Sequence, residues 1–180
     1  MIDGKLFEKC HQEAAKLSEN LASHGQKIVF AESCTAGLVS AILAQIPGIS
    51  QHLCGSLVTY RESAKTDWLT IDPSLIALHS AVSSEVTLAM VQSALSMTND
   101  ADVAVAITGH LEPNASPIGT MSYIGLSRRR DQEITLATMV KISLTAKDRT
   151  TRQWQAACGA LEVANEFYHG ISCNDGTNPV

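Results

Sequence analysis

The sequence predicts an α/β protein, and two observations lead to this fold class. Of the 180 residues, 45% are hydrophobic but only 4% are aromatic. Ala, Val, Ile and Leu therefore fill the core, which is typical of sheets packed between helices. In addition, residues 102–108 form a nearly continuous apolar run, as expected of a strand that is buried on both faces.

The first third of the chain predicts a helix, a strand and a second helix. Apolar residues recur at helical spacing over residues 6–23, and His24-Gly25 ends that helix. Residues 27–31 are short, apolar and β-branched, which predicts a strand. A tight turn then leads into small and apolar residues at 36–46, which predict a helix ending at Pro47-Gly48.

The middle of the chain predicts a second strand and three helices before the buried strand. Residues 53–60 have the pattern of a strand, and 61–69 and 73–78 that of short helices. Ser83 offers an N-cap for a helix that Asn99-Asp100 breaks. After the buried strand, we expect a loop to begin at Gly109.

The last third predicts a hairpin and a long helix. Two prolines and an Asn place residues 110–117 in a loop. Strands at 118–127 and 134–144 flank a polar turn at 128–132. The final helix spans about 148–168, with apolar residues at spacings of three and four.

The length and charge define the general class of protein. We expect a single domain over residues 1–170 and a flexible tail over 171–180. Thirteen Lys and Arg against 18 Asp and Glu give a net charge of −5, which argues against partners such as nucleic acid or a membrane surface. The chain lacks an apolar stretch of membrane-spanning length, and its charged N-terminus argues against a signal peptide, so we expect a cytoplasmic protein.

The cysteines and histidines do not have the spacing of metal ligands. The five cysteines are widely separated, which favours free and mostly buried thiols. The six histidines are scattered, so we expect no structural metal.

The turn at residues 31–37, Ala-Glu-Ser-Cys-Thr-Ala-Gly, is the most informative motif. A hydroxyl at a strand-to-helix turn lies near outward-facing backbone N–H groups, which suit an anion or an oxyanion. Ser33 and Thr35 are therefore candidates for chemistry. Taken alone, either residue is more often a helix cap.

Two further features are candidates for chemistry, and each also has an ordinary structural interpretation. Lys65 follows a predicted strand, and a desolvated lysine can act as a base near neutral pH, although most lysines are simply solvated. Thr108 and Gly109 end the buried strand, where open α/β sheets bind ligands. They are equally compatible with a plain strand end.

Several blocks of the chain together resemble the C-terminal domain of the CinA family, the nicotinamide-nucleotide amidases. The matching blocks are residues 31–37, Pro47-Gly48-Ile49-Ser50, Val58-Thr59-Tyr60 with Ala64-Lys65, residues 79–83, and Thr108-Gly109. They follow one another in order, and the resemblance extends from about Gly25 to about Ala164. It implies a three-layer α/β/α sandwich with a mixed sheet and helices on both faces.

The resemblance also implies an activity. A family member of this kind converts nicotinamide mononucleotide to nicotinic acid mononucleotide and ammonia, without a cofactor or metal, and commonly forms a homo-oligomer. Ser33 is then the nucleophile, Lys65 the base, Tyr60 an orienting residue and Thr35 an oxyanion contact. The substrate-binding positions are Cys34, Ala36, Gly37, Ser50, Thr108, Gly109, Arg149 and Arg152, of which the arginines are expected to meet a substrate phosphate.

One segment departs from the family pattern. After Thr108-Gly109 the family continues with a glycine-rich stretch, whereas residues 110–117 read His-Leu-Glu-Pro-Asn-Ala-Ser-Pro. Lost glycines reshape a loop, and Glu112 repels a phosphate. The alternative to an amidase is therefore a family member that keeps the fold without turnover, as a nucleotide-binding or assembly protein.

Overall fold

The computed structural model describes residues 3–113 and 119–174 and shows a mixed five-stranded sheet. The strands are β1 (Ile28–Glu32), β2 (Leu53–Val58), β3 (Val103–His110), β4 (Met121–Arg130) and β5 (Glu133–Ser143). Their order in the sheet is β2-β1-β3-β4-β5. β1 runs parallel to both of its neighbours, while β4 and β5 are antiparallel.

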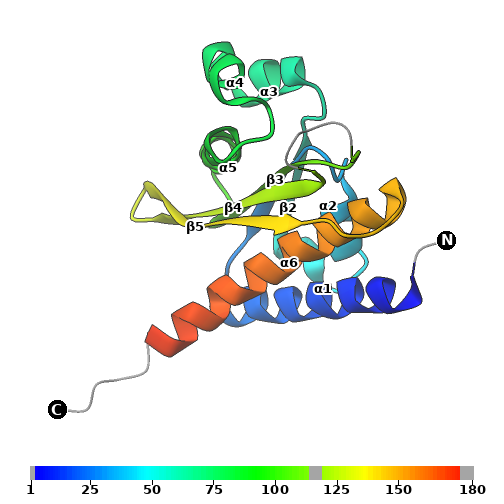
Figure 1. Ribbon diagram of the computed structural model, residues 1–180. Helices are drawn as coiled ribbons and strands as arrows, with labels where there is room; N and C mark the ends of the chain where they lie inside the picture. The colour runs from blue at the N-terminus through cyan, green and yellow to red at the C-terminus, as the bar shows by residue number, and fades with distance from the viewer. Residues whose placement is uncertain (1–2, 114–118, 175–180) are drawn as a thin grey trace.

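Helices cover both faces of the sheet and give the three expected layers (Figure 1). They are α1 (Gly4–His24), α2 (Leu38–Leu43), α3 (Glu62–Leu69), α4 (Pro73–His79), α5 (Ser84–Met97) and α6 (Arg149–Asn174), with a 3₁₀ turn at Ile49–Gln51. α1, α2 and α6 lie on one side of the sheet and α3, α4 and α5 on the other. The expected α/β/α sandwich is confirmed.

Side chains point alternately to the two faces of the central strands, and they form two separate hydrophobic cores. Ile28 and Phe30 of β1 pack in the core shared with α1, α2 and α6. Val29 and Ala31, which point to the opposite face, pack against α5. All five residues of β1 are buried, as are Val103–Thr108 of β3, so the prediction of a strand buried on both faces is confirmed.

The ends of α1 follow from local sequence. Asp3 caps the helix, its side chain accepting a hydrogen bond from the Lys5 amide at 3.1 Å. Gly25 ends it in the left-handed region at φ 60°, where glycine has no steric penalty. Between them, a stripe of four fully buried residues contacts the core, namely Cys10, Ala14, Leu17 and Leu21.

The structure corrects several element boundaries. β3 runs on through His110, because Gly109 and His110 pair with Ser122 and Met121 of β4, so the loop begins later than expected. α2 is shorter than predicted and begins only at Leu38. The hairpin turn narrows to Asp131 and Gln132, both at positive φ, as a tight two-residue turn requires.

The C-terminal helix is longer than the sequence suggested. α6 continues through Asn174, past the end expected near residue 168, and residues 175–180 lie outside the described part. The described helices include none that is long and apolar enough to cross a bilayer.

The topology creates a crevice at the carboxyl end of β1. From β1 the chain passes through α2 on one face to β2, whereas β3, on the other side of β1, follows α5 on the opposite face. Connections that leave a strand in opposite directions leave the space above its carboxyl end open. Any site built from the ends of β1, β2 and β3 must lie there.

Candidate active site

Ser33 lies directly after β1, at the start of a tight turn. Its amide donates a hydrogen bond to the Ile107 carbonyl of β3 at 3.0 Å. This bond holds Ser33 at the carboxyl end of the sheet. The turn then passes through Ala36 and Gly37, at φ 54° and 93°, before α2 begins. Two successive left-handed residues turn the chain within five residues of the end of β1.

A buried carboxylate holds this turn in place. Glu32 is fully buried, and its carboxylate accepts hydrogen bonds from the amides of Val39 and Ser40 at 3.1 and 3.0 Å. It also accepts bonds from the hydroxyls of Ser40 and Ser56 at 2.9 and 3.0 Å. Because the donors belong to α2 and β2, Glu32 ties both elements to the strand that carries Ser33.

Lys65 of α3 approaches Ser33 from the other side. Its side chain is buried, and its ammonium donates hydrogen bonds to Ser33 Oγ at 2.9 Å and to the Thr59 carbonyl at 2.7 Å. Burial lowers the pKa of Lys65 to about 8, from an ordinary value of 10.5, although the charge of the nearby Glu62 acts in the opposite direction. At pH 7 roughly one lysine in ten is therefore neutral and able to accept a proton.

The neighbouring thiol is unsuited to the role of nucleophile. Cys34 is buried, and its Sγ lies 3.6 Å from the Ser122 hydroxyl. Burial raises the pKa of Cys34 to about 11, so the thiol stays protonated at neutral pH. Ser33, which contacts Lys65, is the better candidate nucleophile of the two.

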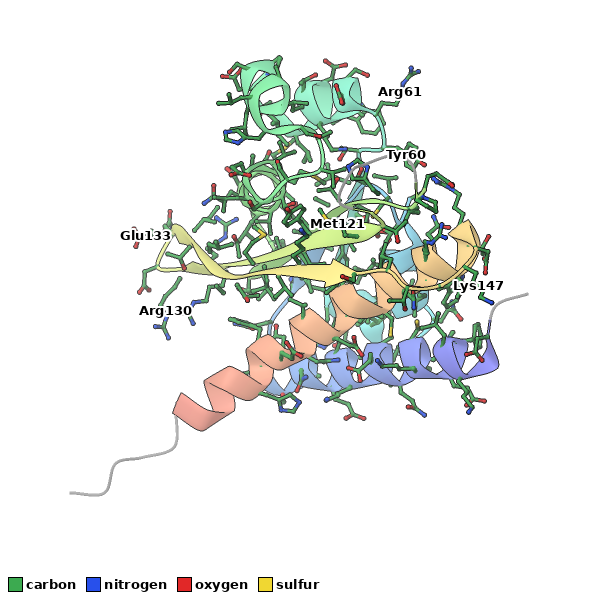
Figure 2. The ribbon with its side chains drawn as sticks, viewed as in Figure 1. Tyr60, Arg61, Met121, Arg130, Glu133 and Lys147 are labelled. Carbon is green, nitrogen blue, oxygen red and sulfur yellow. The ribbon has the colours of Figure 1, made fainter. Side chains whose placement is uncertain are left out.

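A cavity of about 250 Å³ opens in front of Ser33 and Lys65. Its wall comes from the ends of β1 and β3 and from the segments around them, namely Ser33, Cys34, Tyr60, Glu62, Lys65, Ala81, Val82, Thr108, Gly109, His110, Leu111, Glu112 and Arg149. Figure 2 shows Tyr60 at one end of the sheet and Glu133, in the β4–β5 hairpin, at the other. The cavity thus lies at the carboxyl ends of the parallel strands, as anticipated.

Arg149, the first residue of α6, lies at the mouth of the cavity between two partners. Its Nη1 donates to Glu112 Oε1 at 2.8 Å, and its Nη2 donates to the Tyr60 hydroxyl at 2.7 Å. Both side chains of the ion pair are about half exposed, at 48% for Arg149 and 53% for Glu112. Tyr60 therefore contacts the arginine rather than the Ser33–Lys65 pair.

Thr108 and Gly109 form the floor of the cavity. The Thr108 hydroxyl donates to the Ala81 carbonyl at 3.0 Å, which attaches the segment before α5 to β3. A Cβ on Gly109 would lie 2.5 Å from the Met121 carbonyl oxygen and would also meet Ser122. Close approach of β4 therefore requires glycine at this position.

Five of the proposed site residues lie outside the cavity wall, namely Thr35, Ala36, Gly37, Ser50 and Arg152. Thr35 is buried behind the turn, and its hydroxyl has no hydrogen-bond partner among the described residues. Ser50 is exposed in the 3₁₀ turn. Ala36 and Gly37 contribute through the shape of the turn.

Arg152 differs most from its expected role. Its guanidinium is buried and donates to the carbonyls of Leu111, Ala146 and Lys147 at 2.6–2.7 Å. A guanidinium bonded to three carbonyls is a structural clamp between α6 and the end of β3. Arg149 is thus the one of the two arginines that reaches the cavity.

Three residues of the site were given no role from sequence. Glu32 carried a signal, since a carboxylate at the end of an apolar strand must find donors when buried. Glu62 and His110 line the cavity, and burial lowers the pKa of His110, which favours its neutral form. Glu62 belongs to α3 and His110 to β3, and no local sequence pattern reveals that both side chains line the same cavity.

A larger cavity, of about 660 Å³, lies between the β4–β5 hairpin and α6. Its wall includes Arg128, Arg130 and Phe167, but it lacks a nucleophile beside a base. We therefore place the chemistry in the smaller cavity. Within the described residues, no three His, Cys, Asp or Glu side chains gather as a metal site requires.

The fold and this site define a class of protein: an α/β domain with a serine and a buried lysine at the switch point of its sheet. The family model of the CinA C-terminal domain matches residues 11–168, and the chain belongs to this family.

Relatives of known sequence and structure agree with this assignment. The chain is 47% identical over 103 residues to a CinA-like protein of Mycolicibacterium gilvum, a match that covers 55% of this chain and 24% of the relative. A CinA-like protein of Mycobacterium leprae is 43% identical over 112 residues, covering 58% of this chain and 26% of that one. The matched segments thus span about a quarter of the length of these relatives.

Solved structures extend the similarity over most of the chain. A CinA superfamily protein from Klebsiella pneumoniae 700603 superposes with a TM-score of 0.80 at 25% identity, covering 89% of this chain and 98% of that one. The competence/damage-inducible protein CihA from Agrobacterium tumefaciens also gives 0.80 at 25% identity, covering 93% and 98%. The fold is therefore that of the CinA superfamily.

Proposed function

We propose that this domain hydrolyses a carboxamide of the pyridine-nucleotide type, with Ser33 as nucleophile and Lys65 as base. Nicotinamide mononucleotide is the substrate that the family resemblance implies. The observation that carries the proposal is the 2.9 Å contact between Lys65 Nζ and Ser33 Oγ, made by a lysine whose pKa is lowered to about 8. A serine needs such a base, because its own hydroxyl is a weak nucleophile.

The acylation step follows from this geometry. Neutral Lys65 takes the Ser33 proton as Oγ attacks the carboxamide carbon, and the carbonyl oxygen becomes an oxyanion. Among the described residues, the amides of Cys34 and Thr35 donate no hydrogen bond, and they directly follow the nucleophile in the turn. We assign these amides as the backbone donors for the oxyanion.

Release of ammonia and deacylation use the same two side chains. The protonated Lys65 returns its proton to the nitrogen, the C–N bond breaks, and ammonia leaves an ester on Ser33. Water then attacks the ester while Lys65 accepts its proton, and the carboxylic acid leaves as Ser33 recovers its hydrogen. The Thr59 carbonyl, at 2.7 Å from Nζ, keeps the amine oriented through both steps.

Substitution of either residue tests the proposal. Purified protein should release ammonia from nicotinamide mononucleotide, and Ser33→Ala and Lys65→Met should each lower kcat at least about a hundredfold, since each removes a step that the other cannot replace. Lys147→Met, an exposed lysine preceding α6, is the matched control and should keep wild-type turnover. Circular dichroism confirms that the variants are folded.

The competing hypothesis is a binding or assembly protein without turnover, and the altered loop after β3 favours it. The intact Ser33–Lys65 contact favours the enzyme. The binding hypothesis would be supported if the wild-type protein released ammonia no faster than Ser33→Ala and still bound the nucleotide measurably.

A further inference from the structure

The described wall of the cavity beside Ser33 contains one arginine, Arg149, and its guanidinium is already paired with the Glu112 carboxylate. Of the basic side chains in the described wall, Lys65 has a pKa near 8 and is bonded to Ser33, and burial favours the neutral form of His110. Arg149 remains charged at all ordinary pH values. The residues outside the described part of this loop, 114–118, include no ionisable side chain.

Two carboxylates face the same space. Glu112 binds Arg149 Nη1 at 2.8 Å, and Glu62 lies in the wall beside Lys65. The fixed charges of the cavity therefore sum to a negative value while Lys65 is neutral. A phosphate entering this space must displace Glu112 from the arginine or accept a carboxylate beside it, and both cost binding free energy.

We infer that this chain prefers a carboxamide substrate without a phosphate group, and that Glu112 determines this preference by occupying and neutralising Arg149. The inference rests on the proposed amide hydrolysis and deepens it by naming the substrate class. A carboxamide without a phosphate meets no such penalty, because it has no negative charge for Glu112 to repel. The small volume of the cavity, about 250 Å³, also suits a compact substrate.

A pair of substrates that differ only in phosphate tests the inference. Nicotinamide riboside and nicotinamide mononucleotide carry the same carboxamide, and only the second has the phosphate. We expect the wild-type protein to have the higher kcat/KM for the riboside. Glu112→Gln should raise the ratio of kcat/KM for the mononucleotide over the riboside by about tenfold, a moderate effect because the ion pair is half exposed and solvent screens it.

Matched variants separate this effect from a change in total charge. Glu133→Gln removes the same charge at the far hairpin and should leave the ratio unchanged. Adding Arg149→Ala to Glu112→Gln should abolish the gain, since the freed arginine is the group that receives the phosphate. A gain that persists without Arg149 would overturn the role assigned to the pair.

The outcomes distinguish this inference from the proposed function. Hydrolysis of both compounds with a ratio that Glu112→Gln leaves within twofold would overturn the inference alone. If neither compound is hydrolysed, the proposed function fails, and calorimetric binding of the two compounds to Ser33→Ala decides the inference. Glu112→Gln in that background should then tighten only the mononucleotide, and equal affinities or no binding would refute it.

Discussion

At the scale of single residues, the environment of Lys65 decides which chemistry is available. The same side chain on the surface would be protonated and inert at neutral pH. Here burial in α3 penalises the charged form, while Ser33 Oγ and the Thr59 carbonyl hold the amine in one position. The same burial acts in the opposite sense on Cys34, whose pKa rises to about 11, so adjacent residues in one turn have different reactivity.

This difference predicts the pH dependence of turnover. Lys65 must be neutral to accept the Ser33 proton, so kcat/KM should rise with pH, about tenfold per unit below the lysine pKa, and level off above about 8. A steady-state pH profile from 6 to 10 measures this. Lys65→Arg should show no such rise, because a guanidinium does not lose its proton. A profile that is already flat at pH 6–7 would contradict the role of Lys65.

At the scale of elements, Glu32 explains why a six-residue helix can support the site. α2 is too short to be stable alone, and its N-terminal glycine provides no side-chain cap. The Glu32 carboxylate replaces that cap from β1, bonding two amides of α2 and a hydroxyl of β2. The turn that carries Ser33 is therefore fixed at both of its ends.

Removal of this carboxylate should affect both stability and turnover. Glu32→Ala leaves the amides of Val39 and Ser40 and the Ser56 hydroxyl without their acceptor and should lower the free energy of unfolding by about 2–4 kcal/mol. Glu8→Ala, on the exposed side of α1, is the control and should cost under about 0.5 kcal/mol. Urea denaturation measures both. Equal stabilities of the two variants would show that Glu32 does not anchor the turn.

At the scale of the whole molecule, one sheet is shared by two cores. Leu17 of α1 packs on one side and Met90 of α5 on the other, and both are fully buried. Neither layer can bury its apolar face without the sheet between them. The candidate site lies where this sheet ends, so its geometry depends on both layers together.

The shared sheet predicts a single cooperative unfolding transition. The two tryptophans are natural probes, since Trp68 lies in α3 and Trp154 in α6, on opposite sides of the sheet. In each variant that retains only one of them, the urea midpoint from tryptophan fluorescence should equal the midpoint from circular dichroism of the same variant. Leu17→Ala and Met90→Ala should each lower the midpoints reported by both tryptophans, because each substitution lowers the free energy of unfolding by about 2–5 kcal/mol. Two separate midpoints would show that the layers unfold independently.

Most of the fold could be predicted from the sequence, because its signals are local. Apolar patterns, helix caps and turn residues indicated each described α-helix and strand, and the nearly continuous apolar run indicated that β3 is buried on both faces. Errors fell at boundaries. β3 extends past Gly109 because β4 pairs with it, a contact that no pattern within residues 102–110 contains.

The sequence by itself determined the elements, the family blocks and the residue types of the Ser33–Lys65 pair. The tertiary structure decided which of the proposed residues meet: it placed Arg149 beside Tyr60 and Glu112, and directed Arg152 to three backbone carbonyls. The physical reason is distance along the chain. Burial, charge pairing and pKa arise from side chains that are far apart in sequence, and only the packing of α3, β3 and α6 around the end of β1 brings them together.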